Sequence, residues 1–394
     1  MPSESSFWIV SVPVSEEKSR EQMIKDLRSR LVKDNAIAPS EIAGVPFPDF
    51  TTGTLESLIS LADELPKNDA FFASVLSRIV DTLRALFNDD EQALNEHLVI
   101  DGESVGDYVM NWHWDASKYR ADRQLPELVE MLDKEMHSID NVMKQKLTTY
   151  NGVKGQLQQL ERKKNGNISV RSLADVVHKD DIVDPNSEFL ETLLIAIPNT
   201  QVKAWLSTYE HLTKFVVPRS SSKICEDSEY ALFNVTIFKR VHDEFVQKAR
   251  EHKFQVREFA YDEAQMERER QELEETGASE KELWTELVRL SRTNFADAYQ
   301  AMIHFKVLRT FVESVLRFGL PADYVASVLC PNAGRATQLI KALNSEYSYL
   351  QEYARYSSKD TSNSAPQDTP GEFANLLEQE VFPFVLTEQP IIIA

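Results

Sequence analysis

Histidine is the side chain most often used to bind a metal or move a proton near neutral pH. The chain contains eight histidines, and they are scattered along it. None forms an H-E-x-x-H pair or lies at zinc-ligand spacing from a cysteine. We therefore expect surface or structural roles for His97, His113, His137, His178, His211, His242, His252 and His304.

The cysteines and the clustered carboxylates are equally weak candidates for chemistry. Two cysteines, Cys225 and Cys330, are too few for a disulfide framework and favour a reducing compartment. Acidic residues follow Cys225, and they raise a thiol pKa, which argues against a nucleophile. Asp180 with Asp181, and the acidic run 89–91, could bind a metal, but exposed acidic loops explain them better.

Two further clusters could hold a ligand. Trp112 and Trp114 flank His113, and aromatic packing is a better explanation than a ligand cage. Lys163, Lys164 and Arg171 could bind an anion, although lysines at a helix C-terminus also complement the helix dipole. The sequence has no phosphate-binding loop or dinucleotide fingerprint. It therefore predicts no catalytic, cofactor-binding or metal-binding residue, and hence no enzyme.

Composition restricts the classes of partner. The chain has 394 residues, of which 42% are hydrophobic, so it can hold two or three domains with real cores. Its formal net charge of −20 repels nucleic acid and anionic lipid and suits protein partners. No apolar run approaches the ~20 residues of a membrane span. We therefore expect no direct membrane insertion.

The element that organises the chain is a long helix predicted for residues 125–160. Apolar side chains recur there at steps of three and four, which places one stripe along the helix, and only Lys146 interrupts it. Such a helix is about 54 Å long, too long to be enclosed by one small core. It needs a partner of similar length. The stripe consists of Val129, Leu132, Met136, Ile139, Met143, Tyr150, Val153, Leu157 and Leu160.

The expected partner is a second helical stretch, residues 262–317. Its first part, residues 262–282, is charge-dense and contains Gly277, so we expect an interrupted and mobile section there. From Trp284 the apolar stripe returns, and Gly319 and Pro321 end the helix. The stripe consists of Leu287, Phe295, Ala298, Met302, Phe305, Val312 and Leu316.

The remaining segments predict a helix-rich α+β fold. Apolar or β-branched runs indicate strands at 7–12, 193–197, 230–238, 324–329 and 381–386, with extended segments at 215–218 and 254–261. Amphipathic stretches indicate helices at 18–33, 55–65, 71–87, 202–209 and 334–356. Residues 357–371 are polar and contain two prolines, which indicates a loop.

Pairing of the two long helices brings their ends together. We therefore expect residues 1–120 and 319–394 to form one lobe, residues 166–261 a second lobe, and helices 121–165 and 262–318 an antiparallel neck between them. This arrangement is an elongated dumbbell. It suggests an interaction protein rather than an enzyme.

Six distinctive segments span nearly the whole chain. They are FWIVSVP at 7–13, GNISVRSLADVVHKDDIVDPNSEFLETLLIAIP at 166–198, EDSEYALFNVTIFKRVHDEF at 226–245, KFQVREF at 253–259, LVRLSRTNFADAYQAMIHFKVLRTFVESVLRFGLP at 287–321 and VFPFVL at 381–386. In these segments the sequence resembles the C subunit of the eukaryotic vacuolar-type proton-pumping ATPase (V-ATPase), and the fungal members most.

The resemblance implies a dumbbell whose head is the middle lobe and whose foot joins both termini. It implies a non-catalytic stator that links the ATP-hydrolysing sector to the membrane sector and leaves when the pump disassembles. Implied partners are the peripheral stalks formed by the E and G subunits, at head and foot, and the cytosolic part of the membrane sector's a subunit, at the foot. The implied location is the cytoplasmic face of the vacuolar membrane. A different class remains open, a cytoskeletal or trafficking adaptor that binds actin.

Overall fold

The computed structural model describes residues 6–15, 17–169, 171–173, 176–183, 187–257, 259, 263–331, 334–350 and 382–390. These residues belong to two compact units. The first unit takes its residues from Met1–Lys146 and Glu286–Ala394, and the second from Leu147–Thr285. Each unit is described by itself.

The first unit is built on a four-stranded antiparallel sheet in the order β10-β1-β9-β2. Its strands are β1 (Ser6–Pro13), β2 (Ile42–Val45), β9 (Tyr324–Leu329) and β10 (Val385–Pro390). The register pairs Ser6 with Pro390 and Trp8 with Leu329, so strands from opposite ends of the described chain are neighbours. The run predicted as a buried strand at 7–12 is confirmed as β1, an inner strand of this sheet.

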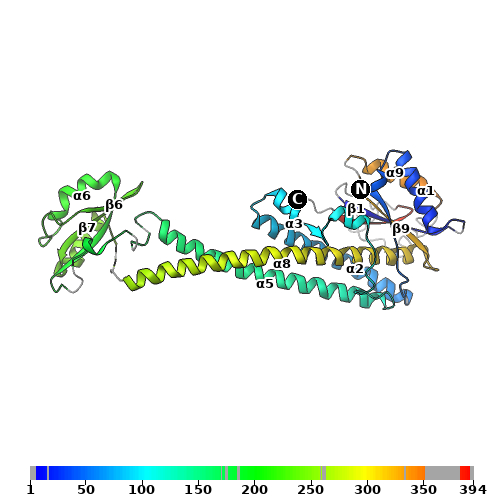
Figure 1. The fold of residues 1–394 in the computed structure, drawn as a ribbon, viewed down its shortest axis with the longest axis horizontal. Helices are drawn as coiled ribbons and strands as arrows, with labels where there is room; N and C mark the ends of the chain where they lie inside the picture. The colour runs from blue at the N-terminus through cyan, green and yellow to red at the C-terminus, as the bar shows by residue number, and fades with distance from the viewer. Residues whose placement is uncertain are drawn as a thin grey trace, which may run out of the picture. The chain divides into compact units, whose positions relative to one another are not determined.

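Both faces of β1 are covered, so seven of its eight residues are buried, Ser11 among them. Trp8, Val10 and Val12 point to the core that contains α1 (Arg20–Lys33) and α9 (Ala336–Glu346). Ser11 points the other way, and its hydroxyl lies 2.8 Å from that of Ser314 in α8 (Glu263–Phe318). Figure 1 shows α1 and α9 beside this sheet. Because side chains alternate along a strand, β1 packs against α1 and α9 on one face and contacts α8 on the other.

Helix α2 (Leu55–Leu86) also belongs to the first unit, together with four short elements. The prediction of two helices, at 55–65 and 71–87, was wrong in this respect, because α2 continues through Pro66. A proline inside a helix removes one backbone hydrogen bond. Burial of Leu61 and Leu65 before Pro66, and of Phe72 after it, favours one continuous packed face. The short elements are α3 (Glu91–His97), β3 (Val99–Ile100), β4 (Glu103–Ser104) and α4 (Val105–Met110).

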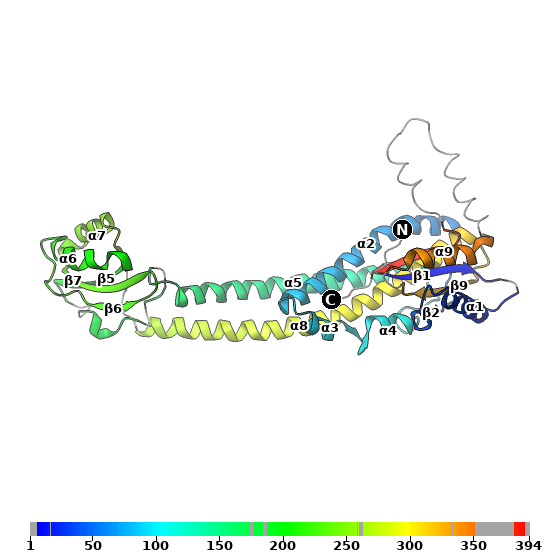
Figure 2. The same cartoon turned by 90° about the horizontal axis from the view of Figure 1, so that it is seen from above.

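The second unit contains a four-stranded antiparallel sheet in the order β6-β7-β5-β8. Its strands are β5 (Leu190–Pro198), β6 (Lys223–Glu226), β7 (Tyr230–Phe238) and β8 (Gln255–Arg257). Helices α6 (Val202–Thr208) and α7 (His242–Glu251) cover one face, where Trp205 and Phe245 are fully buried. Figure 2 shows both helices on the same side of the strands. Ile168, Leu173 and Val177 pack on the other face, against Leu194 and Leu232.

The predicted long helices are α5 (Leu125–Asn165) and α8, and each contributes residues to both units. Within the first unit, Met143 Sδ lies 3.9 Å from Ser291 Oγ, and Lys146, which interrupts the stripe, forms a 2.6 Å ion pair with Glu286. Within the second unit, Tyr150 donates a hydrogen bond of 2.9 Å to Glu280. In the first unit, rising numbers on α5 therefore meet falling numbers on α8. In the second unit, Tyr150 lies beside Glu280 and Leu157 beside Gly277, which is the same antiparallel direction.

The charge-dense part of α8 differs from the expectation in one respect. Helix α8 continues through Gly277 without interruption. A Cβ atom at Gly277 would lie 3.8 Å from Leu157 Cδ1, so this position faces α5 rather than solvent. The apolar stripe of α5 is buried as far as Tyr150, and Val153, Leu157 and Leu160 are half-buried. Mobility of residues 262–282 stays a prediction, and Asp262 lies outside the described residues.

The other predicted elements are mostly confirmed. Strands β5, β7 and β9 and helices α1 and α6 lie where the sequence patterns placed them, with boundary shifts of a few residues. Helix α9 begins close to its predicted start but ends at Glu346, well before the predicted end at 356, and residues 351–356 lie outside the described part of the chain. The closing strand β10 begins four residues later than predicted and ends at Pro390, because Thr387, Glu388 and Gln389 also pair with β1. Residues 351–381, which include the predicted loop 357–371, lie outside the described part of the chain.

Candidate functional site

The C-terminal part of α8 carries polar side chains in a segment that is otherwise apolar and buried. Ile303, Phe305 and Val307 lie among them and are almost inaccessible. A helix that is buried on all sides must find a partner for every polar group, since an unpaired buried charge is costly. The polar residues recur at three- and four-residue steps, and they are Lys306, Arg309, Thr310, Glu313 and Ser314.

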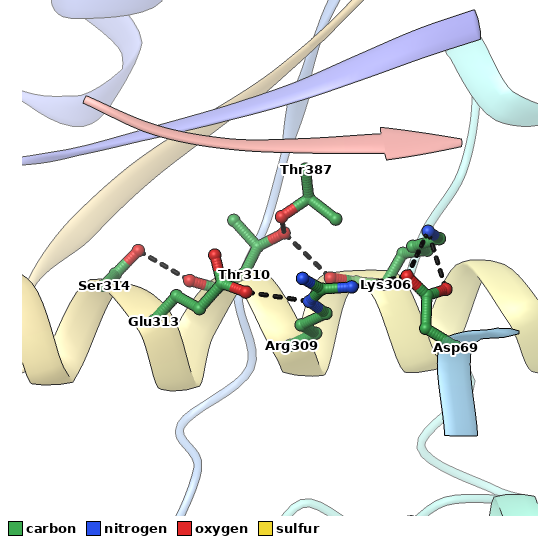
Figure 3. A network of polar contacts seen from close by, with 7 residues as sticks. All are labelled: Asp69, Lys306, Arg309, Thr310, Glu313, Ser314 and Thr387. Atoms are coloured by element: carbon green, nitrogen blue, oxygen red, sulfur yellow. Dashed lines mark hydrogen bonds and ion pairs between the residues drawn. The ribbon is translucent and has the colours of Figure 1, made fainter. Parts of the chain in front are cut away.

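Asp69 of α2 is the acidic centre of this network (Figure 3). The ammonium of Lys306 lies 2.7 Å from one carboxylate oxygen of Asp69 and 2.8 Å from the other. The guanidinium of Arg309 also pairs with Asp69, and its Nε donates a 2.7 Å hydrogen bond to Glu313. Burial lowers the pKa of Lys306, and the nearby Asp69 carboxylate opposes this effect. The charges of two carboxylates and two cations therefore cancel at a largely buried contact between α2 and α8.

Hydroxyl groups connect the same helix to the sheet. The hydroxyls of Thr310 and of Thr387 in β10 lie 2.8 Å apart (Figure 3). Ser314 and Ser11 of β1 make the equivalent contact, and all four residues are almost fully buried. Thr310 and Ser314 also donate to backbone carbonyls one helical turn earlier. The network therefore fixes α8 to α2 on one side and to two strands on the other.

A second cluster surrounds His304, on the same helix. Its imidazole lies about 5 Å, centre to centre, from the rings of Trp112, Trp114 and Tyr119, at 5.1, 4.9 and 4.8 Å. The backbone N–H of Asp115 donates to His304 Nε2 at 3.0 Å, and Nδ1 lies 2.7 Å from the carbonyl of Gln300. The ring must therefore be neutral, with its proton on Nδ1.

The pKa of His304 follows from this environment. Burial lowers it from 6.5 to about 4, against the opposing effects of the Gln300 carbonyl and the Asp115 carboxylate. The nearby ionisable groups Lys118 and Glu135 also act on it. The prediction that Trp112 and Trp114 pack as aromatic residues is confirmed, since both are buried against His304 while His113 between them is exposed.

The lysine cluster is only partly assembled in the second unit. Lys163 and Lys164 line a cavity of about 440 Å³ with Ser172 and Arg270, but Glu269, Glu272 and Glu274 line it too. Arg171 instead directs its Nη2 to the sulfur of Cys225, at 3.6 Å. Lys163, Lys164 and Arg171 therefore do not converge on one site. The three glutamates that line the cavity offset the charges of Lys163, Lys164 and Arg270, so the lining has no net positive charge to bind an anion.

The remaining candidates have structural roles. Asp90 caps α3 by accepting from two backbone N–H groups, and Asp181 accepts from the backbone of His178. The pKa of Cys225 is raised, chiefly by burial rather than by the acidic neighbours the sequence suggested. Burial also raises the pKa of Cys330. Among the described residues, no group of three or more histidine, cysteine or acidic side chains could hold a metal ion.

Sequence reasoning missed the network around Asp69 and the environment of His304. A signal was present: Lys306, Arg309 and Glu313 interrupt an apolar helical stripe, and charges in such a position require partners. The partner Asp69 lies 237 residues earlier, in a helix whose own pattern marks it as an ordinary surface residue. Only the packing of α2 on α8 reveals it.

Both units therefore consist of packed cores and paired helices, with polar groups used to fix elements to one another. A family model described as the C subunit of the V-ATPase matches residues 7–385. The chain belongs to this V-ATPase C-subunit family, and it is a peripheral component of that proton-transporting complex.

Curated relatives agree with this assignment over almost their full length. The chain is 39% identical over 381 residues to the C 1 subunit of the V-type proton ATPase of Rattus norvegicus, covering 97% of each chain. It is 38% identical over the same length to the Xenopus laevis protein and to the C 1-A subunit of Danio rerio, again covering 97% of each chain. The family assignment gives no support to the alternative of a cytoskeletal adaptor.

A solved structure, the cytoplasmic N-terminal domain of the I subunit, a homologue of the a subunit of V-ATPase, aligns with a TM-score of 0.32 at 12% identity. The alignment covers 86% of this chain and 97% of that one, and at this score it carries no argument. No helix among the described residues is both long and apolar enough to cross a membrane.

Proposed function

We propose that this chain is a non-catalytic stator that links the ATP-hydrolysing sector of the pump to its proton-conducting membrane sector. The observation that carries the proposal is the antiparallel pairing of α5 and α8, with contacts between them in each unit. Paired helices resist bending better than one helix. A stator needs such an element because it must withstand torque between distant contacts.

We further propose a dumbbell with the boundaries expected from the sequence: a foot from residues 1–120 and 319–394, a head from 166–261, and a neck from 121–165 and 262–318. Small-angle X-ray scattering of the isolated chain checks it. A compact globule of this length has a radius of gyration of about 21 Å. We expect a clearly larger value, and one near 21 Å would contradict the dumbbell.

The proposed partners are those implied by the family resemblance. The head binds one peripheral stalk made of the E and G subunits, and the foot binds another together with the cytosolic part of the membrane sector's a subunit. The proposed location is the cytoplasmic face of the vacuolar membrane. Several moderate interfaces suit reversible release, because linked contacts give avidity that disappears when one contact is lost.

A deletion experiment tests the proposal. Cells without this chain should fail to acidify their vacuoles, and the full-length chain expressed in them should restore acidification. Immunoprecipitation of the ATP-hydrolysing sector measures assembly in the same cells. Intact acidification in the deletion strain would contradict a stator role. If acidification fails although the ATP-hydrolysing sector still assembles with the membrane sector, the chain is needed for pumping but does not link the two sectors.

A further inference from the structure

Three phenylalanines lie next to one another across one end of the sheet in the second unit. Phe238 ends β7, and its N–H donates to the carbonyl of Phe215 at 3.1 Å. The rings of Phe215 and Phe238 contact edge to face, with centres 6.0 Å apart. On the other side of β7, the carbonyl of Phe189 accepts from the N–H of Lys239 at 2.9 Å. Backbone hydrogen bonds therefore place the three residues in neighbouring segments at this end of the sheet, with Phe215 opposite Phe238 and Phe189 opposite Lys239.

Two of these three phenylalanines are exposed, which is unusual for side chains of this size. Phe189 is 68% accessible and Phe215 is 39% accessible, and Phe238 is half-buried. Phe238 packs against the core that contains Trp205, Phe233 and Phe245, whereas Phe189 and Phe215 are not part of that core. Adjacent exposed aromatic residues of this kind mark binding surfaces more often than isolated apolar residues do.

Three cations lie next to these phenylalanines in the sequence, and one of them stacks on two of the rings. Lys214 precedes Phe215, and Lys239 and Arg240 follow Phe238. The guanidinium carbon of Arg240 lies 3.5 Å from the centre of the Phe215 ring and 5.6 Å from that of Phe238. Among the described residues, no carboxylate forms an ion pair with Lys214 or Arg240. We call Phe189, Phe215, Phe238, Lys214, Lys239 and Arg240 the Phe–Arg patch.

We propose that the Phe–Arg patch binds an acidic segment of another pump subunit that also presents an apolar side chain; this inference rests on the proposed function. Charge complementarity selects the acidic partner, because three cations lie in these segments of a chain of net charge −20. Of the acidic residues next to them in the sequence, Glu191 is already paired with His242, and Glu188 and Asp243 remain. Arginine and aromatic residues are the usual energetic centres of protein interfaces. The stacking on Phe215 holds the Arg240 guanidinium in place, and its N–H edges suit a carboxylate.

Two other occupants fit less well. Recognition of anionic lipid by a basic patch uses about four to eight lysines or arginines, and a strongly acidic chain is repelled by such a membrane. A second copy of this chain would bring a net charge of −20 against another −20. A protein segment of opposite charge meets neither obstacle.

Recruitment to the pump tests the proposal. Vacuolar membranes from the deletion strain, which carry the pump's other subunits, are mixed with the ATP-hydrolysing sector and the purified full-length chain. The bound chain is then quantified. We expect the double variant Phe189→Ser/Arg240→Glu to need about tenfold higher concentration for half-maximal recruitment, a loss of about 1.4 kcal/mol. The single variant Lys214→Glu should show a smaller loss, about threefold, in an exposed loop where folding is not at risk.

The matched control is Lys203→Glu/Leu206→Ser on α6. These residues are also an exposed cation and an exposed apolar side chain of the second unit, with Leu206 53% accessible. We expect this control to be recruited like the wild type, and circular dichroism to show that all variants are folded.

Four results would overturn the inference. If the patch variants are recruited like the wild type, the Phe–Arg patch is not a binding surface, and the proposed function is unaffected. A wild-type chain that is not recruited would overturn both. Phosphatidylserine vesicles that bind the wild type but not Arg240→Glu would make the patch a lipid site. Light scattering that detects a wild-type dimer abolished by Phe189→Ser would assign the patch to self-association.

Discussion

Replacing Asp69 by alanine is expected to destabilise the first unit by about 3–5 kcal/mol, the usual cost of removing one partner of a buried ion pair. The Lys306 side chain is only 6% accessible, so its charge would remain in a desolvated site without its carboxylate. Arg309 would keep Glu313 as a partner. Amide hydrogen exchange of the α8 peptide 303–318 measures the effect locally, so that unfolding of the second unit does not interfere.

Two comparisons isolate the ionic contribution. The double variant Asp69→Ala/Lys306→Met should recover at least half of the loss, because an apolar side chain of similar length needs no partner. Asp26→Ala breaks the pair with Lys18, in which both side chains are half exposed, and should cost far less than Asp69→Ala because water screens an exposed pair. Equal effects of Asp69→Ala and Asp26→Ala would show that burial of the network contributes nothing.

Acidification is expected to destabilise the first unit through His304. Its pKa is about 4 in the folded chain and 6.5 in the reference state. Between these values the unfolded chain binds the proton and the folded chain does not, so stability falls as the pH falls. The contribution is complete above pH 6.5 and is lost by about pH 4. Its size is about 3 kcal/mol, at 1.36 kcal/mol for each pKa unit.

The variant His304→Gln tests this origin. Glutamine can accept from the Asp115 N–H but does not titrate, so the free energy of unfolding should depend less on pH between 4 and 6.5 than in the wild type. Asp115 and Glu135 remain in both proteins. His113→Gln, at the exposed ring between the two tryptophans, should leave the profile unchanged. An unaltered slope in His304→Gln would assign the acid sensitivity to the carboxylates.

Local patterns were sufficient to predict much of the fold. The period of the apolar stripe identified α5 and the second half of α8, and β-branched runs identified β1, β7 and β9. Errors arose where packing overrides a local signal. Pro66 lies inside α2 because burial on both sides of it outweighs one missing hydrogen bond, and Gly277 faces Leu157 across the helix pair.

The functional features were harder to predict because they join residues that are remote in sequence. The network around Asp69 joins residues of β1, α2, α8 and β10. The sequence pattern of any one of these elements does not indicate which other elements it contacts. The Phe–Arg patch similarly requires three segments to meet at one end of a sheet. Sequence alone recognised Phe215 and Phe238 as parts of extended segments, but their exposure depends on which face the helices cover.

The topology of the first sheet also sets an order for folding during synthesis. Strand β1 lies between β9 and β10 in this sheet, and Val12 pairs with Val325. At about 5–20 residues per second, a ribosome needs roughly 15 to 60 s to make the intervening chain. The sheet of the second unit lies within one continuous stretch, so it can close while translation continues. The apolar strand β1 can complete its pairing only after β9 and β10 have been made, so we expect the first unit to close later than the sheet of the second unit.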